Sequence, residues 1–60
     1  MAMKTLTVKN RSGKHMSTFQ AGTWKRLARM YSEIMKRNTH LKTYNVSTRG
    51  NHATVTVTRA

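Results

Sequence analysis

Residues 44–57 read YNVSTRGNHATVTV, and this stretch carries the strongest structural pattern in the chain. Polar and apolar residues alternate on both sides of Gly50-Asn51, a pair that is typical of a two-residue hairpin turn. The register that this turn sets places three pairs of residues opposite one another: Arg49 and His52, Val46 and Val55, and Tyr44 and Val57. All the apolar side chains then share one face, which we expect to be buried.

The other face of this hairpin is predicted to be polar. It collects hydroxyl and amide side chains, with a basic corner next to the turn: Thr43, Asn45, Ser47, Arg49, His52, Thr54, Thr56 and Thr58. Alternation of this kind indicates antiparallel strands with one side against a core and the other towards solvent.

Residues 24–37, which precede this hairpin, show the spacing of an amphipathic helix. Six apolar residues fall on one side at the intervals i, i+3, i+4 and i+7: Trp24, Leu27, Ala28, Tyr31, Ile34 and Met35. Thr23 is suited to cap the first turn, and Asn38 to end the helix in a left-handed conformation. Because the aromatic residues of this stripe and Tyr44 all fall on predicted apolar faces, we expect them in the core rather than stacked on a ligand.

The N-terminal part reads as a second hairpin. Residues 4–9 alternate around Leu6 and Val8, residues 10–13 form a turn, and residues 15–20 carry the weaker pattern of a returning strand. The sequence therefore predicts a single α+β domain over residues 1–60, with one amphipathic helix packed on a small antiparallel sheet. Its order is β-β-α-β-β, or β-α-β-β if residues 15–20 form no strand.

The charge of the chain is strongly one-sided. Its 60 residues include 12 Lys and Arg against one acid, Glu33, which gives a formal net charge of +11. Such an imbalance costs self-repulsion in the compact state and is typical of proteins that bind polyanions. The expected partner is therefore nucleic acid, either DNA or RNA, or else an acidic protein.

Three groups of basic residues are candidates for this contact. The helix contributes Lys25, Arg26, Arg29, Lys36 and Arg37, the first turn contributes Lys9, Arg11 and Lys14, and the C-terminal hairpin contributes Arg49. Cations of this kind contact phosphates. Whether the three groups share one surface is left open by the sequence.

The sequence predicts no catalytic residues, no metal site and no cofactor. One acid cannot provide paired carboxylates, and His15, His40 and His52 lack the spacing and companion ligands of a metal site. The absence of cysteine excludes disulfides and thiolate ligands and indicates a reducing, cytoplasmic location. No apolar stretch approaches the roughly 20 residues that cross a bilayer, so we expect a soluble protein without a membrane partner.

One enzymatic alternative comes from a resemblance over residues 27–58. The helix, the strand with Tyr44, the turn at residues 50–52 and the strand at residues 54–57 resemble the helix-strand-strand part of double-stranded-RNA-binding folds and of HicA-type toxin ribonucleases. The resemblance implies that His52 acts as a general base on a ribose 2′-hydroxyl, without a metal. The chain departs from these families by extra residues before the helix and by lacking a further strand and helix after the hairpin.

We therefore expect a non-enzymatic nucleic-acid-binding protein that uses its basic helix face and first loop on phosphates. The alternative is a small modulator or inhibitor, of the kind encoded by viruses or mobile elements, that binds an acidic host protein. A HicA-like ribonuclease is the third hypothesis. No small-molecule substrate is expected, and the sequence is compatible with a homodimer.

Overall fold

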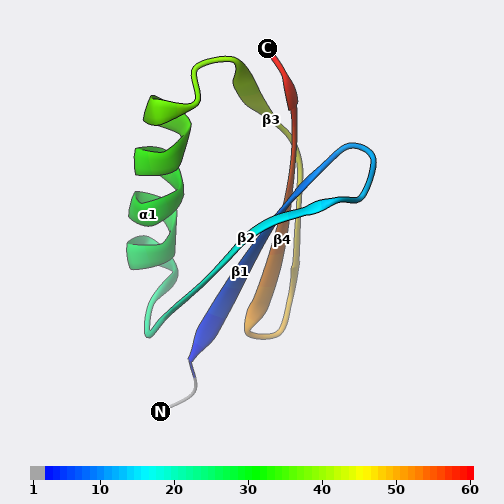
Figure 1. Ribbon diagram of the computed structural model, residues 1–60. Helices are drawn as coiled ribbons and strands as arrows, with labels where there is room; N and C mark the ends of the chain where they lie inside the picture. The colour runs from blue at the N-terminus through cyan, green and yellow to red at the C-terminus, as the bar shows by residue number, and fades with distance from the viewer. Residues whose placement is uncertain (1–2) are drawn as a thin grey trace.

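The computed structural model describes residues 3–60 and contains one helix and four strands (Figure 1). In chain order these are β1 (Lys4–Asn10), β2 (His15–Ala21), α1 (Trp24–Arg37), β3 (Leu41–Arg49) and β4 (His52–Arg59). The predicted order β-β-α-β-β is confirmed, and so is the strand at residues 15–20. The helix lies along one face of the sheet, as predicted.

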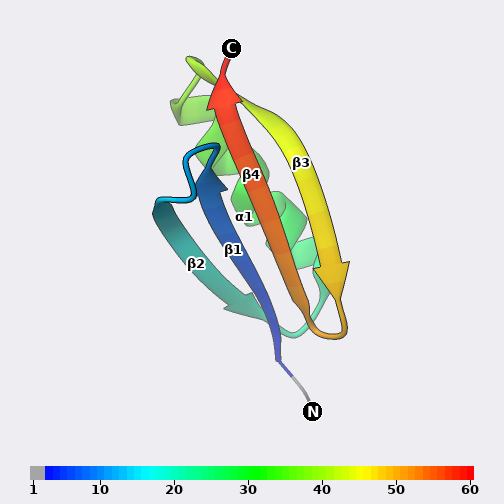
Figure 2. The ribbon, with the colours of Figure 1, turned by 90° about the vertical axis from the view of Figure 1, so that its right-hand side faces the viewer.

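The strand order in the sheet is β2-β1-β4-β3, so the first and last strands of the chain lie at its centre (Figure 2). The two hairpins are antiparallel, but β1 and β4 pair in parallel, for example Leu6 with Ala53. The sheet is therefore mixed rather than wholly antiparallel as predicted. Residue alternation is the same in both kinds of strand, and it is the crossover through α1 that makes parallel pairing between the two hairpins accessible.

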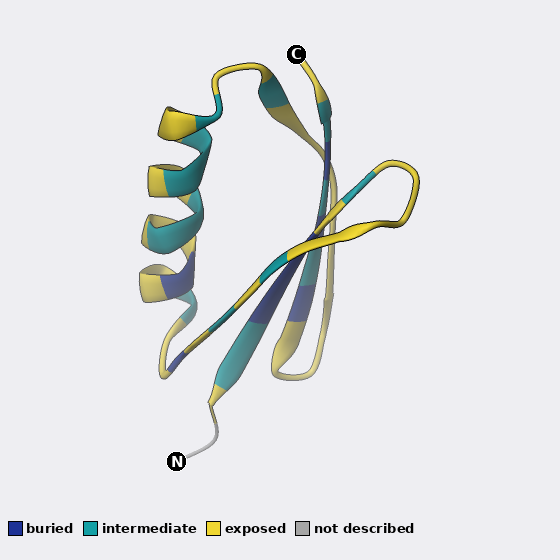
Figure 3. Ribbon diagram, in the orientation of Figure 1, coloured by how far each residue is buried: buried dark blue, intermediate teal, exposed yellow. Residues whose placement is uncertain are grey.

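The core lies between the helix and the central strands. It consists of buried apolar residues from β1, β2, α1 and β4: Leu6, Val8, Ala21, Leu27, Ala53, Val55 and Val57. Larger, half-buried side chains pack around it: Phe19, Trp24, Met30, Tyr31, Met35 and Leu41. Figure 3 shows the buried segments gathered on β1 and β4 and on the first turn of the helix.

The helix begins where the sequence predicts and ends differently. The Thr23 hydroxyl accepts a hydrogen bond from the Arg26 backbone N–H at 3.3 Å, which confirms the N-cap. Asn38 has a φ of −117°, so the predicted left-handed ending is wrong. Instead, the Asn38 backbone N–H and side-chain amide both donate to the Ile34 carbonyl oxygen, at 3.1 and 2.8 Å. These bonds satisfy a terminal carbonyl without a left-handed residue.

The C-terminal hairpin has the predicted turn but contains one irregularity. Gly50 has a φ of 59°, and Arg49 pairs with His52 and Val46 with Val55, as expected. A β-bulge then places Thr43, rather than Tyr44, opposite Val57. Because a bulge adds one residue to a strand, the side chains beyond it exchange faces.

The bulge makes the predicted burial of Tyr44 wrong, since its side chain is 57% exposed. Thr43 takes the position towards the helix, where its Oγ1 lies 2.6 Å from the Tyr31 hydroxyl oxygen. Val46 keeps its predicted face but is 56% exposed, because α1 packs mainly against β1 and β2. Ala28, on the adjoining side of the helix, is exposed as well.

Candidate functional site

The structure divides the predicted basic residues between two surfaces on opposite sides of the molecule. The helix covers one face of the sheet (Figure 1), and its five cations are exposed to solvent. We call the other face, which α1 does not cover, the open sheet face. Lys9 and Arg49 lie on it, because they pair with Thr56 and His52 at positions that alternate with the buried Val55 and Ala53. The three basic groups therefore do not form one continuous surface.

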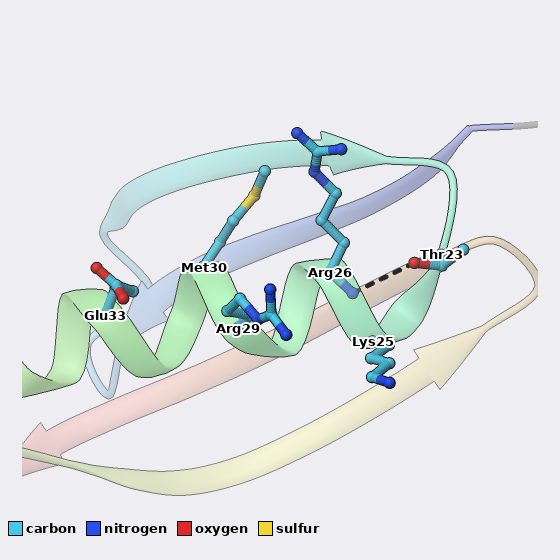
Figure 4. Close-up of a pocket in the computed structure, with 6 residues that line it drawn as sticks. All are labelled: Thr23, Lys25, Arg26, Arg29, Met30 and Glu33. Atoms are coloured by element: carbon cyan, nitrogen blue, oxygen red, sulfur yellow. Dashed lines mark hydrogen bonds between the residues drawn. The ribbon is translucent and has the colours of Figure 1, made fainter.

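The cations of the helix spread around its exposed side. Figure 4 shows Arg26 directed towards β2 and Lys25 towards β3, so these neighbours diverge. The chain's single acid, Glu33, lines the same shallow hollow as Lys25, Arg26 and Arg29. The remaining cations of α1, Lys36 and Arg37, occupy its last turn, where positive charge also stabilises the helix dipole. The helix surface is thus of mixed sign, and part of its charge has a structural role.

The open sheet face combines cations with a dense array of neutral hydrogen-bonding groups. The strand pairings place the following side chains on it: Thr5, Thr7, Lys9, Thr18, Gln20, Lys42, Asn45, Ser47, Arg49, His52, Thr54, Thr56 and Thr58. None of these residues is acidic. Hydroxyl, amide, ammonium and guanidinium groups are the ones that contact phosphate and sugar oxygens in nucleic-acid complexes.

Both histidines of this surface contact a threonine hydroxyl. His52 Nε2 lies 3.1 Å from Thr7 Oγ1, a contact between β4 and β1, and His15 Nε2 lies 2.6 Å from Thr18 Oγ1 within β2. The pairing of Lys9 with His15 places the second contact on the open sheet face as well. The first contact orients the His52 ring across two strands, and the second orients the His15 ring along β2.

The tip of the first hairpin is a tightly bonded loop that leans away from the helix (Figure 1). The Asn10 side-chain oxygen accepts from the backbone N–H groups of Ser12 and Lys14, at 3.0 and 2.9 Å, and from the Ser12 hydroxyl at 2.6 Å. Gly13 has a φ of 89°, which favours glycine at this position. The loop is therefore fixed in shape by its own sequence, and it carries Arg11 and Lys14.

Arg11 extends from this tip to β3, on the far side of the sheet. Its guanidinium carbon lies 4.4 Å from the centroid of the Tyr44 ring, which is a cation–π contact. Tyr44 is therefore an exposed aromatic residue of the open sheet face, not a core residue. Sequence reasoning missed both Tyr44 and Lys42, because the bulge moves both residues to this face and no sequence signal marks the bulge.

His52, the residue on which the ribonuclease hypothesis depends, is exposed on the open sheet face. Glu33 lies on α1, on the opposite side of the sheet from His52. Within residues 3–60 no three His, Cys, Asp or Glu side chains come together as a metal site would require.

Comparisons of the chain with protein-family models, with curated proteins and with solved structures give no match. In the described part of the chain, no helix has the length and apolar character needed to cross a membrane. The functional inference therefore depends on the surfaces of this molecule alone.

Proposed function

We propose that the protein binds nucleic acid, without catalysis, through the open sheet face and the tip of the first hairpin. The observation that carries this proposal is the composition of that surface, which combines cations and hydroxyl groups with no acidic residue among those placed on it. The contacts would be made to phosphates and sugars, so we expect little selectivity for base sequence.

The cations of this surface are distributed so that a polyanion can lie across the sheet. Lys9 is on the central strand β1, whereas Lys42 and Arg49 are at the two ends of the edge strand β3. Between them, threonines of β4 provide neutral donors. A nucleic acid backbone crossing the strands would meet a cation at each end of its path and hydroxyl groups in the middle.

The Arg11–Tyr44 pair favours a single strand over a duplex. The Arg11 guanidinium lies over one face of the exposed Tyr44 ring, so an unpaired base would stack on the outside of this pair, and base–aromatic stacking contributes about 1–3 kcal/mol. The bases of a duplex are already stacked and cannot use it. Because every base has a flat aromatic face, this contact adds affinity without base specificity.

The test compares two variants that each lose three positive charges. The first replaces Lys9, Lys42 and Arg49 with Gln, and the second replaces Lys25, Arg29 and Lys36 with Gln. Binding to a fluorescent oligothymidine of about 16 nucleotides and to a duplex of equal length is measured between about 50 and 200 mM salt. With about four phosphates contacted, the wild-type slope of log K against log salt is expected near −0.7 × 4, or about −3, on the single strand.

The open-face variant should bring that slope to about −1 and weaken binding at least about tenfold at low salt. The helix variant should change both quantities much less, and both proteins should keep their circular dichroism spectra. Equal losses in the two variants would contradict the assignment to the open sheet face. Absence of binding by the wild type at micromolar concentrations would contradict the nucleic-acid function itself.

A further inference from the structure

A second surface of the molecule is apolar and lies on the helix side of the sheet. A groove of about 390 Å³ runs between α1 and β3, and none of its lining residues is charged. Trp24, Ala28 and Tyr31 form its helix wall, Val46 forms its β3 wall, and Val55 lies at its floor. We call this feature the edge groove. It exists because the helix packs mainly on β1 and β2 and leaves the inner face of β3 uncovered.

The strand that borders the edge groove also has a free backbone edge. β3 is the outermost strand on its side, so in the described part of the chain no strand pairs with its outer backbone groups. Lys42 and Arg49 lie near its ends, but the six residues between them carry no charge. Natural edge strands are usually protected by a charge, a proline, a bulge or a covering element. The bulge of β3 is at Tyr44, and residues 45–48 beyond it carry no charge and no proline.

The solvent-accessible surface of the chain is also larger than that of a compact monomer of the same mass. The chain exposes 4594 Å², whereas a compact monomer of 6.9 kDa exposes about 4,000 Å². The excess is comparable to the roughly 800 Å² that each partner buries in a protein–protein interface of standard size. An exposed strand edge next to an apolar groove is the arrangement that binds an extended peptide as an added strand.

We propose that the edge groove and the outer edge of β3 bind an extended segment of a partner protein in which apolar and acidic residues alternate. The segment pairs with β3 through its backbone. Its apolar side chains enter the groove against Trp24 and Val46, and its acidic side chains, which alternate with them, point to the open sheet face, where Lys42 and Arg49 lie near the ends of β3.

Charge complementarity favours an acidic segment as the occupant of the edge groove and the β3 edge. Lys42 and Arg49 are exposed near the two ends of β3 on the open sheet face, to which every second side chain of an added strand points. A second copy of the chain is a poorer occupant. Antiparallel pairing of two β3 edges would place both helices on one face of the joined sheet, with their lysines facing each other and a net charge of +11 on each copy. Nucleic acid is poorer still, because the groove wall carries no cation.

The binding test uses the chain's single tryptophan as its reporter, since Trp24 lines the groove. The probe is a synthetic octapeptide of alternating Val and Glu, and the two control peptides alternate Val with Lys and Ser with Glu. The Val/Glu peptide should shift the Trp24 emission to shorter wavelength and protect alternate backbone amides of β3 from hydrogen exchange. The Ser/Glu peptide should bind at least about tenfold more weakly, and the Val/Lys peptide should not bind.

Three variants test the site itself, and the last two form a matched pair. Val46→Thr keeps the shape and strand preference of the side chain but removes one apolar contact, and it should weaken the Val/Glu peptide about fivefold. Lys42→Gln should weaken it about threefold, whereas Arg26→Gln, on the helix and directed towards β2, should leave it unchanged. Because these side chains are exposed, circular dichroism should show intact folding in all three variants.

Several results would overturn the proposal. One is the absence of any Trp24 response to the Val/Glu peptide up to about 1 mM. Another is equal binding of the Val/Lys peptide. A third is a concentration-dependent dimer, measured by light scattering, in which the β3 amides are already protected, since a second copy would then occupy the edge. The proposal does not rest on the nucleic-acid function, because peptide binding is measured without nucleic acid. Since both ligands would contact Lys42 and Arg49, an oligonucleotide that binds the open sheet face should compete with the peptide.

Discussion

Val46 and Val55 are the same residue type, face each other across β3 and β4, and lie on the same face of the sheet. Nevertheless, Val55 is 4% exposed and Val46 is 56% exposed. The difference shows that strand register and burial have separate causes. The turn and the alternation of residues set the register within the hairpin, whereas burial depends on where α1 lies.

Simple dimensions explain why one strand is left uncovered. Neighbouring strands lie about 4.8 Å apart, so the outer strands of a four-stranded sheet are separated by about 14 Å. A helix with its side chains is about 10–12 Å wide. One helix therefore cannot cover both edges of this sheet, and α1 covers the β2 side, where Phe19 and Ala21 meet it.

Replacing each valine with alanine removes the same atoms from both positions and tests directly whether Val46 and Val55 differ in burial. Val55→Ala should destabilise the protein by about 2 kcal/mol, because it leaves a cavity in the core. Val46→Ala should cost about 0.5 kcal/mol or less, as is typical of exposed positions. Urea denaturation followed by circular dichroism measures both values against a total stability of about 3–9 kcal/mol for a chain of this length. Equal losses would mean that β3 is covered in solution.

A smaller loss of stability is expected when the hairpin turn is altered and the packing of α1 on the sheet is left unchanged. Gly50→Ala should cost about 1 kcal/mol, because the φ of 59° is unfavourable for a residue with a Cβ atom. Gly22 provides the matched control, since neither its φ nor its surroundings hinder a Cβ atom, and Gly22→Ala should be close to neutral. A negligible loss in Gly50→Ala, measured by thermal unfolding, would show that the turn does not set the register.

The smallest expected effect concerns the hydrogen bond between helix and β3. Tyr31→Phe removes the 2.6 Å contact with Thr43 and should cost about 0.5 kcal/mol, because the bond is exposed to water. Its consequence should be local: amides of β3 near Thr43 should exchange faster, while those of β4 should be unchanged. Uniformly faster exchange across the sheet would indicate that this bond holds the whole fold rather than one edge.

Much of the fold was predictable because it is encoded locally. The stripe over residues 24–37 and the Gly50-Asn51 turn both correspond to what forms, and so does the pairing of Val46 with Val55. The parallel contact between β1 and β4 was not predictable in the same way, because it joins distant segments and leaves no mark on their alternation. The bulge at Tyr44 was equally hidden, since a single inserted residue looks like ordinary sequence.

The candidate site was predictable in composition but not in arrangement. The sequence identified the excess of cations and the hydroxyl-rich face of the last hairpin. It also placed Arg49 on that face, but it could not show that Lys9 joins it while Lys25 and Arg29 lie on the other side of the molecule. It also placed Tyr44 in the core, whereas the structure places it beside Arg11. Each of these differences depends on the position of the helix or on the bulge.

The parallel pairing of β1 with β4 has a consequence for how the chain folds. Leu6 contacts the strand that carries Ala53, so the central ladder of the sheet joins the two ends of the sequence. Contacts of such long sequence separation slow folding, because a large loop must close before they form. Each hairpin alone is a two-stranded unit, which is marginal in water. The chain should therefore fold in one cooperative step, with both hairpins gaining stability only when the first and last strands meet.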